Sequence, residues 1–141
     1  MQIGVEVSRM VDNRRIFIVH EDEILRAAMQ FMLHDENEAH ELASLDDAFA
    51  RAAKVKVDLL LLDMAIVWSR GTKVLAEIKS RMPGVTVLLV AESKDDPDAH
   101  ACLSAGADGI IGKPLTIANV RHRVDISLGR VPVGQAWRQA S

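Results

Sequence analysis

The charged side chains that follow the apolar runs of this chain are the residues whose types and spacing could do chemistry. They are His20, Glu21 and Asp22 after the first run, Asp63 after the third, Glu92 (between Ala91 and Ser93) after the fourth, and Lys113 after the fifth. In an open parallel sheet, ligands bind beyond the carboxyl ends of the strands, near the point where the strand order reverses. We therefore expect a group of acids and one lysine to meet at a single patch.

This patch argues against nucleotide binding. A flavodoxin needs a phosphate loop rich in Ser, Thr and Gly after its first strand, and a dinucleotide-binding fold needs G-x-G-x-x-G. Residues 21–23 are instead three consecutive acids, which would repel a phosphate. The sequence also shows no Ser/His or Cys/His nucleophile–base pair and no cofactor motif, so we expect a protein that is not an enzyme.

The elements that would position these residues follow from hydrophobic periodicity. Continuous apolar runs at 16–19, 59–62, 85–90 and 109–112 predict strands buried on both faces, and a weaker strand is expected at 39–43. Helical spacing predicts five intervening helices, marked by Ile24, Ala28, Phe31 and Met32; by Leu45, Ala48, Phe49 and Ala52 after a start at Ser44 and Asp47; by Val74, Leu75, Ile78 and Met82 before Pro83-Gly84; by Ala99, Cys102 and Leu103; and by Ile117, Val120, Val124 and Leu128.

The alternation of strands and helices predicts an α/β protein with a doubly wound, five-stranded parallel sheet and right-handed crossovers. We expect an N-terminal extension at 1–13, one domain at 14–128 and a tail at 129–141 that is too short to be an output domain.

Composition excludes several classes of protein but does not identify the class to which this one belongs. A length of 141 residues with 49 % hydrophobic and 26 % charged residues is ordinary for one globular domain. The net charge of −3 gives no reason to expect nucleic acid or a membrane surface as partner. A single cysteine, Cys102, forms no internal disulfide and favours a reduced, cytoplasmic compartment. No apolar run approaches the roughly 18–20 residues of a membrane span.

Taken in order, the chain resembles the receiver domains of two-component response regulators over residues 14 to 128. The residues that carry the resemblance are the acidic turn after 16–19, Asp63, Gly71 eight residues later, Ala105-Gly106-Ala107-Asp108 and Lys113-Pro114. The resemblance implies a (βα)5 receiver (flavodoxin-like) fold in which Asp63 accepts a phosphoryl group from a sensor histidine kinase. It also implies that Lys113 pairs with the phosphoryl oxygens and that the Lys113-Pro114 bond is cis.

The resemblance further implies a Mg²⁺ ion held by acids of the first turn and by Asp63. Here the chain departs from the pattern, because His20 and Glu21 stand where the family has two aspartates. Imidazole favours softer metals than Mg²⁺, and Glu21 is one methylene longer than aspartate. Asp22 can compensate only if the turn shifts by one residue. We expect Mg²⁺ binding to be weak or absent.

The switch positions of the family also differ. Ala91 stands where the family has a Thr or Ser that bonds the phosphoryl group, and a one-residue shift gives Val90, which has no hydroxyl either. Ser93 lies on the following loop. Ile110 replaces a common aromatic residue, so we expect phosphorylation to be only weakly coupled to conformation.

We therefore expect a stand-alone receiver module in a phosphorelay that signals by protein–protein contact, with a sensor histidine kinase or phosphotransfer protein as partner. By analogy, the fourth helix, fifth strand and fifth helix form a face for a homodimer or a downstream protein. The alternative is a phosphorylation-independent interaction module with a vestigial pocket. Trp68, expected on the loop after Asp63, gates the site, contacts a partner or packs on the third helix, and Trp137 in the tail is left open.

Overall fold

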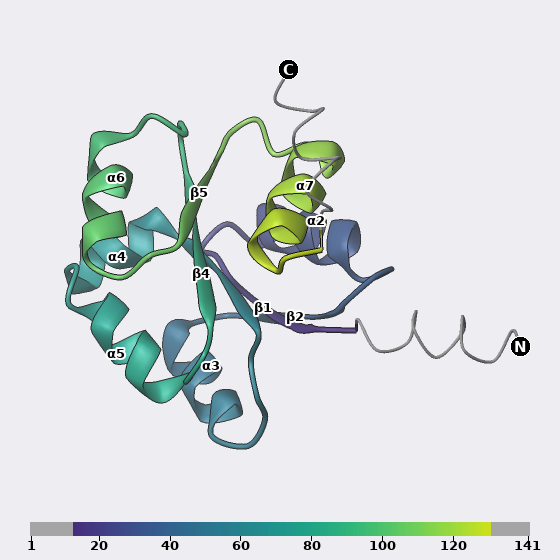
Figure 1. Cartoon of the computed structure of the whole chain (residues 1–141), viewed down its shortest axis with the longest axis horizontal. Coiled ribbons are helices and arrows are strands. Elements are labelled where there is room, and N and C mark those ends of the chain that lie inside the picture. Colours follow the sequence, from purple (N-terminus) through teal and green to yellow (C-terminus); the bar gives the residue numbers. More distant parts are fainter. Residues whose placement is uncertain (1–12, 131–141) are drawn as a thin grey trace, which may run out of the picture.

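The computed structural model describes residues 13–130 and shows a central sheet with helices on both faces (Figure 1). The elements in chain order are β1 (Arg15–Val19), α2 (Glu23–Leu33), β2 (Glu38–Leu42), α3 (Leu45–Ala52), β3 (Leu59–Asp63), α4 (Met64–Arg70), α5 (Val74–Arg81), β4 (Thr86–Ala91), α6 (Pro97–Ser104), β5 (Gly109–Gly112) and α7 (Ile117–Ser127). Among the described helices, none is both long and apolar enough to cross a membrane.

The five strands are parallel and lie in the order β2-β1-β3-β4-β5. The order reverses between β1 and β3, so the ends of these two strands flank the usual ligand position of the fold. Val19 lies opposite Leu62 in the β1–β3 pair, and Asp63 lies opposite Val90 in the β3–β4 pair. The doubly wound parallel sheet predicted from the sequence is confirmed.

Two apolar layers hold the sheet between its helices. Helices α2 and α7 cover one face, and α3, α4, α5 and α6 cover the other (Figure 1). In β3, Leu60 and Leu62 face the four-helix side while Leu59 and Leu61 face α2 and α7, and all four are fully buried. Burial on both faces is the reason that this strand reads as an unbroken apolar run.

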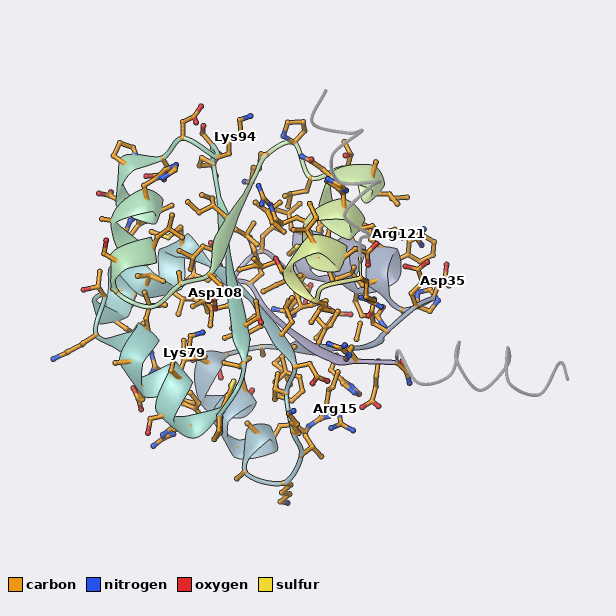
Figure 2. The ribbon with its side chains drawn as sticks, in the orientation of Figure 1. Arg15, Asp35, Lys79, Lys94, Asp108 and Arg121 are labelled. Atoms are coloured by element: carbon orange, nitrogen blue, oxygen red, sulfur yellow. The ribbon has the colours of Figure 1, made fainter. Side chains whose placement is uncertain are left out.

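Side-chain hydrogen bonds begin two of the helices that the sequence predicts and hold the start of one strand in place. Ser44 begins α3 by accepting the Asp47 N–H at 3.1 Å, and Asp96 with Pro97 begins α6. Asp108, the last residue of the Ala-Gly-Ala-Asp motif, accepts the Val87 N–H at 2.8 Å and the Lys79 ammonium at 2.6 Å (Figure 2). Asp108 thus ties the start of β5 to β4 and α5.

The face assigned to the first helix is wrong. The sequence places Ile24, Ala28, Phe31 and Met32 together, but Ile24 and Phe31 are 80 % and 65 % exposed. The core instead receives Met29 and Leu33. The helix carries apolar residues around most of its circumference, so spacing alone does not select the face that meets the sheet.

The segment after Asp63 is also a helix and not the expected loop, which raises the number of helices in the described residues to six. The Asp63 carboxylate accepts the Ala65 N–H at 3.0 Å and so caps the first turn of α4. Met64 and Val67 are buried against the core, and Gly71, with a φ of 88°, ends the helix.

Candidate functional site

A cavity of about 210 Å³ lies at the carboxyl edge of the sheet. Six of the candidate residues line it, namely His20, Glu21, Asp22, Asp63, Ala91 and Lys113. Four segments that are far apart in sequence therefore meet there, as the positions after the apolar runs predict. Ile110 lies elsewhere, buried in the core between the sheet and the four-helix side.

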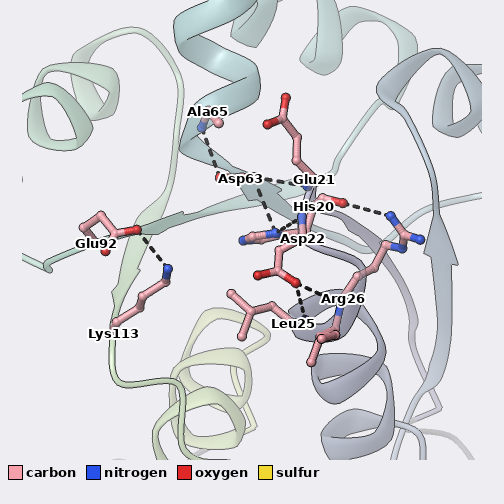
Figure 3. A network of polar contacts seen from close by, with 10 residues as sticks. His20, Glu21, Asp22, Leu25, Arg26, Asp63, Ala65, Glu92 and Lys113 are labelled. Atoms are coloured by element: carbon pink, nitrogen blue, oxygen red, sulfur yellow. Dashed lines mark hydrogen bonds and ion pairs between the residues drawn. The ribbon is translucent and has the colours of Figure 1, made fainter.

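Asp63 lies in this cavity with both carboxylate oxygens held by backbone N–H groups. Oδ1 accepts the N–H of Ala65 at 3.0 Å, and Oδ2 accepts the N–H of Glu21 at 3.2 Å (Figure 3). Only 12 % of the side chain is exposed. The first turn and the start of α4 thus fix the carboxylate at the end of the central strand, facing the cavity.

His20 is buried next to Asp63. Its Nδ1 accepts the N–H of Asp22 at 3.0 Å and lies 3.4 Å from Asp63 Oδ2. A neutral ring in this arrangement carries its proton on Nε2. Arg26 donates from Nη1 to the His20 carbonyl at 3.0 Å (Figure 3), so the backbone of His20 is hydrogen-bonded as well as its ring. The imidazole is a hydrogen-bonded part of the turn.

Asp22 belongs to the first helix more than to the cavity. Its Oδ1 accepts the N–H groups of Ile24 at 2.9 Å and Leu25 at 3.2 Å, which makes it the N-cap of α2. The hydrogen bond from the Leu25 N–H lowers the pKa of this carboxyl group. The neighbouring Glu21 side chain is exposed. Asp22 therefore has a structural role as the N-cap of α2, and this role does not require the turn to shift by one residue.

Lys113 is bonded to Glu92, a residue that the sequence places after the fourth apolar run but to which it gives no role in the site. Its Nζ donates to Glu92 Oε2 at 2.8 Å (Figure 3). This bond to the Glu92 carboxylate raises the pKa of Lys113. Glu92 follows the fourth apolar run after Ala91, so the sequence places it at this edge of the sheet. The Lys113-Pro114 bond is cis, as the resemblance implies.

Ala91 ends β4 and is buried at the cavity wall beside Val90. Neither side chain has a hydroxyl group. Ser93 lies on the next loop, where its Oγ accepts the N–H of Asp95 at 3.1 Å. Trp68 lines the cavity from α4 and is 57 % exposed. The apolar side chains of Val90 and Ala91, the exposed indole of Trp68 and several charged side chains therefore line the site.

The donor set fits a magnesium ion poorly, because His20 replaces one of the acidic ligands that the resemblance implies. Mg²⁺ prefers near-octahedral oxygen ligands supplied by carboxylates and water. Here Asp22 caps a helix and an imidazole stands between it and Asp63. Within residues 13–130, no three His, Cys, Asp or Glu side chains are arranged to hold a metal. Asp63 and the exposed Glu21 are the two carboxylates that remain near the turn.

A family model described as the response regulator receiver domain matches residues 16–125. The response regulator protein VraR of Staphylococcus aureus is 26 % identical over 113 residues, which cover 78 % of this chain and 54 % of VraR. The KDP operon transcriptional regulatory protein KdpE of Escherichia coli is 26 % identical over 116 residues, which cover 82 % and 51 %. The chain spans about half the length of these curated relatives.

Solved structures show the same fold. A response regulator from Thermotoga maritima superposes with a TM-score of 0.73 at 21 % identity, covering 83 % of this chain and 98 % of that one. The chemotaxis protein CheY4 of Vibrio cholerae superposes with a TM-score of 0.72 at 18 % identity, covering 82 % and 99 %.

Proposed function

The chain belongs to the response regulator receiver domain family of two-component signalling, and from this premise we propose that Asp63 is its phosphoacceptor. The observation that carries the proposal is the position of the Asp63 carboxylate. It ends the central strand, is held by the Glu21 and Ala65 N–H groups, and faces a cavity that Lys113 also lines. This arrangement presents a carboxylate oxygen to a phosphoryl donor.

In the proposed step an Asp63 oxygen attacks the phosphorus of a phosphohistidine on a sensor kinase or phosphotransfer protein. The O–P bond forms, the P–N bond breaks, and its electron pair stays on the departing imidazole, which takes up a proton. Charge decides how fast this step is, because the nucleophile and the phosphoryl group are both anionic. Four carboxylates line the cavity against one ammonium, that of Lys113. We infer slow phosphorylation.

Lys113 is the residue suited to neutralise the incoming phosphoryl group, since an ammonium is a compact point charge. To do so it must leave Glu92, to which it is bonded at 2.8 Å. We propose that Mg²⁺ contributes little at cellular concentrations, because His20 takes the place of an acidic ligand in the turn. Phosphorylation then depends on Lys113 more than on the metal.

We also propose that the phosphoryl group is weakly coupled to conformation. Ala91 has no hydroxyl to bond a phosphoryl oxygen, which removes a charge-assisted hydrogen bond of roughly 1.5–3 kcal/mol. A whole allosteric coupling energy is commonly about 1–3 kcal/mol. The signal is passed on by protein–protein contact, and the face formed by α6, β5 and α7 supports a dimer or partner complex because it exposes Leu103 and Ile117.

The test is incubation with a small phosphodonor such as phosphoramidate, followed by intact-mass measurement of the wild type and of Asp63→Asn. The proposal expects a single phosphoryl adduct on the wild type alone. An unmodified wild type with every donor and metal tried contradicts it and favours the alternative function.

That alternative is a phosphorylation-independent interaction module, and two contacts favour it. Lys113 is already paired with Glu92, and the His20 ring already lies beside Asp63. Lys113 and Asp63 thus already have polar partners within the protein without a phosphoryl group. In this second function the same surfaces bind a partner constitutively. The cytoplasmic location expected from the single cysteine stays a prediction in both cases.

A further inference from the structure

The imidazole of His20 carries a hydrogen-bond donor that the rest of the described chain does not use. Its Nδ1 accepts the N–H of Asp22 at 3.0 Å, so the neutral ring holds its proton on Nε2. Within residues 13–130, no group accepts a hydrogen bond from this Nε2–H. Only 7 % of the side chain is exposed. Most buried side-chain polar groups have a hydrogen-bond partner, so this N–H marks a position where a ligand can bind.

The Nε2 atom of His20 faces the cavity. The ring lines the cavity together with Asp63 and Lys113, and Nε2 retains contact with solvent. In Figure 3 this nitrogen lies at the end of the ring away from Asp22, on the side of Lys113. Turning the ring over would place a carbon atom against the Asp22 N–H, so that hydrogen bond determines which nitrogen faces the cavity.

Hydrogen bonds to the turn hold this donor beside the carboxylate of Asp63. Arg26 donates to the His20 carbonyl at 3.0 Å, which fixes the backbone from which the ring extends. Oδ2 of Asp63 lies 3.4 Å from Nδ1 of the ring and accepts the Glu21 N–H at 3.2 Å. A donor that is oriented in advance, in a site from which water is largely excluded, stabilises developing negative charge more strongly than a mobile donor in water.

A phosphoryl group on Asp63 would bring its oxygens to the same edge of the ring. The terminal oxygens of an acyl phosphate lie two bonds beyond the carboxylate oxygen, a distance comparable to the one between the two nitrogens of an imidazole. A phosphoryl group on Oδ2, which starts 3.4 Å from Nδ1, can therefore place one oxygen against the Nε2–H. The ammonium of Lys113 is already bonded to Glu92 at 2.8 Å, whereas the Nε2–H is available without breaking a bond within the described chain.

We propose that the Nε2–H of His20 donates a hydrogen bond to a phosphoryl oxygen on Asp63 and supplies part of the stabilisation that a divalent cation would give. This inference rests on the proposed role of Asp63 as phosphoacceptor. It makes His20 a residue that contacts the transferred group and not only a part of the turn. Asp63 is then phosphorylated without a divalent metal, at a rate that depends on the imidazole.

The test is phosphorylation of the whole chain by phosphoramidate in the presence of EDTA, followed by intact-mass measurement. His20→Asn keeps an acceptor near the position of Nδ1 but loses the Nε2–H, whereas His20→Gln places an amide N–H near the position of Nε2. We expect the rate to fall about tenfold in His20→Asn and to be largely retained in His20→Gln, because only the second keeps a donor to the phosphoryl oxygen. His100→Asn is the matched control, since His100 is exposed on α6 outside the cavity, and it should leave the rate unchanged.

NMR of the imidazole nitrogens gives a second measurement that needs no variant. A long-range ¹H–¹⁵N spectrum of the wild type should show His20 as the Nε2–H tautomer, and its Nε2 signal should shift on phosphorylation while that of His100 does not. A proton on Nδ1 of His20 in the unphosphorylated protein overturns the inference, because Nε2 then has no hydrogen to donate. Circular dichroism checks that the two His20 variants keep the fold.

The outcomes separate this inference from the proposed function. If the wild type is phosphorylated but His20→Asn reacts as fast, or His20→Gln is as slow as His20→Asn, the role of His20 is overturned and Asp63 remains the phosphoacceptor. A wild type that stays unmodified with every donor, with and without metal, overturns both.

Discussion

The buried imidazole of His20 lies against the carboxylate of Asp63, with Nδ1 3.4 Å from Oδ2. The same Nδ1 accepts the Asp22 N–H at 3.0 Å, so the ring is part of the turn that carries it. An imidazole therefore stands where the family resemblance implies an anionic ligand. This contact accounts for the weak metal chemistry that we propose, and it leaves Lys113 as the ammonium on which phosphoryl transfer depends.

Replacement of His20 by aspartate is expected to raise Mg²⁺ affinity about tenfold, which corresponds to about 1.4 kcal/mol. The added carboxylate supplies a hard oxygen ligand beside Asp63. Titration followed by Trp68 fluorescence measures the change, since this indole lines the cavity. His20→Asn is the matched control, because it keeps the size of aspartate without the charge. Equal affinities of the two variants would show that the turn does not direct a side chain at position 20 toward the ion.

Replacement of Glu92 by glutamine is expected to increase the rate of Asp63 phosphorylation several-fold. The Glu92 carboxylate holds Lys113 at 2.8 Å and raises its pKa, so the variant both releases the ammonium and lowers that pKa. Phosphorylation kinetics and the pH titration of the Lys113 side chain by NMR measure the two effects. Glu21→Gln serves as control, because Glu21 lines the same cavity but the ammonium of Lys113 is bonded to Glu92 instead. A rate that rises equally in both variants would mean that net charge alone governs the step.

Replacement of Ala91 by threonine is expected to strengthen the response to phosphorylation. The new hydroxyl stands at the end of β4, at the cavity wall, and could bond a phosphoryl oxygen. The readout is the change in Trp68 fluorescence on phosphorylation, which we expect to be larger than in the wild type. Valine at the same position matches threonine in shape without the hydroxyl. A response to phosphorylation as large with valine as with threonine would assign the effect to packing.

Acid unfolding gives a test of the scaffold. Glu38 is bonded to Arg15 at 2.6 Å and to His40 at 2.9 Å, and the Arg15 bond above all lowers its pKa from 4.5 to about 2. A lowered carboxyl pKa stabilises the fold above the unfolded value, and this contribution is lost as the pH falls from about 4.5 toward about 2. Because the side chain is 40 % exposed, the contribution is within the about 0–1 kcal/mol of a surface pair.

Urea unfolding of the wild type and of Glu38→Gln should therefore differ at neutral pH and converge near pH 2. Glu36→Gln, on the exposed turn before β2, should show no such convergence. A difference between the wild type and Glu38→Gln that persists unchanged at low pH would assign the effect to packing of the Glu38 side chain.

The strands and the meeting of the site residues could be predicted from the sequence because burial on both faces leaves an unbroken apolar signal. Leu59 to Leu62 form such a run, and Asp63 directly follows them. Helix α4 could not be predicted with the same ease, since its N-cap is the very residue that we assigned to chemistry. Asp63 caps the helix with Oδ1 and faces Glu21 with Oδ2, a double role that spacing does not reveal.

Neither the buried face of the first helix nor the partner of Lys113 could be predicted from the sequence. Helix α2 has apolar residues on both its inner and outer faces, so the choice of Met29 and Leu33 for the core depends on where the sheet lies. Lys113 is an exposed, flexible side chain, and its partner is decided by the loop after β4, where Glu92 lies within reach. Sequence order placed Lys113 at the correct edge of the sheet but could not choose between the carboxylates around it.

The central claim is that Asp63 itself carries the phosphoryl group, and reductive trapping tests it most directly. After incubation with phosphoramidate the protein is treated with borohydride, which reduces an acyl phosphate to the alcohol and so converts a phosphorylated aspartate to homoserine, and the peptide that contains residue 63 is sequenced by mass spectrometry. The account predicts homoserine at position 63 in the wild type and none in Asp63→Asn. Unmodified Asp63, or homoserine at another acid such as Asp22, would contradict it.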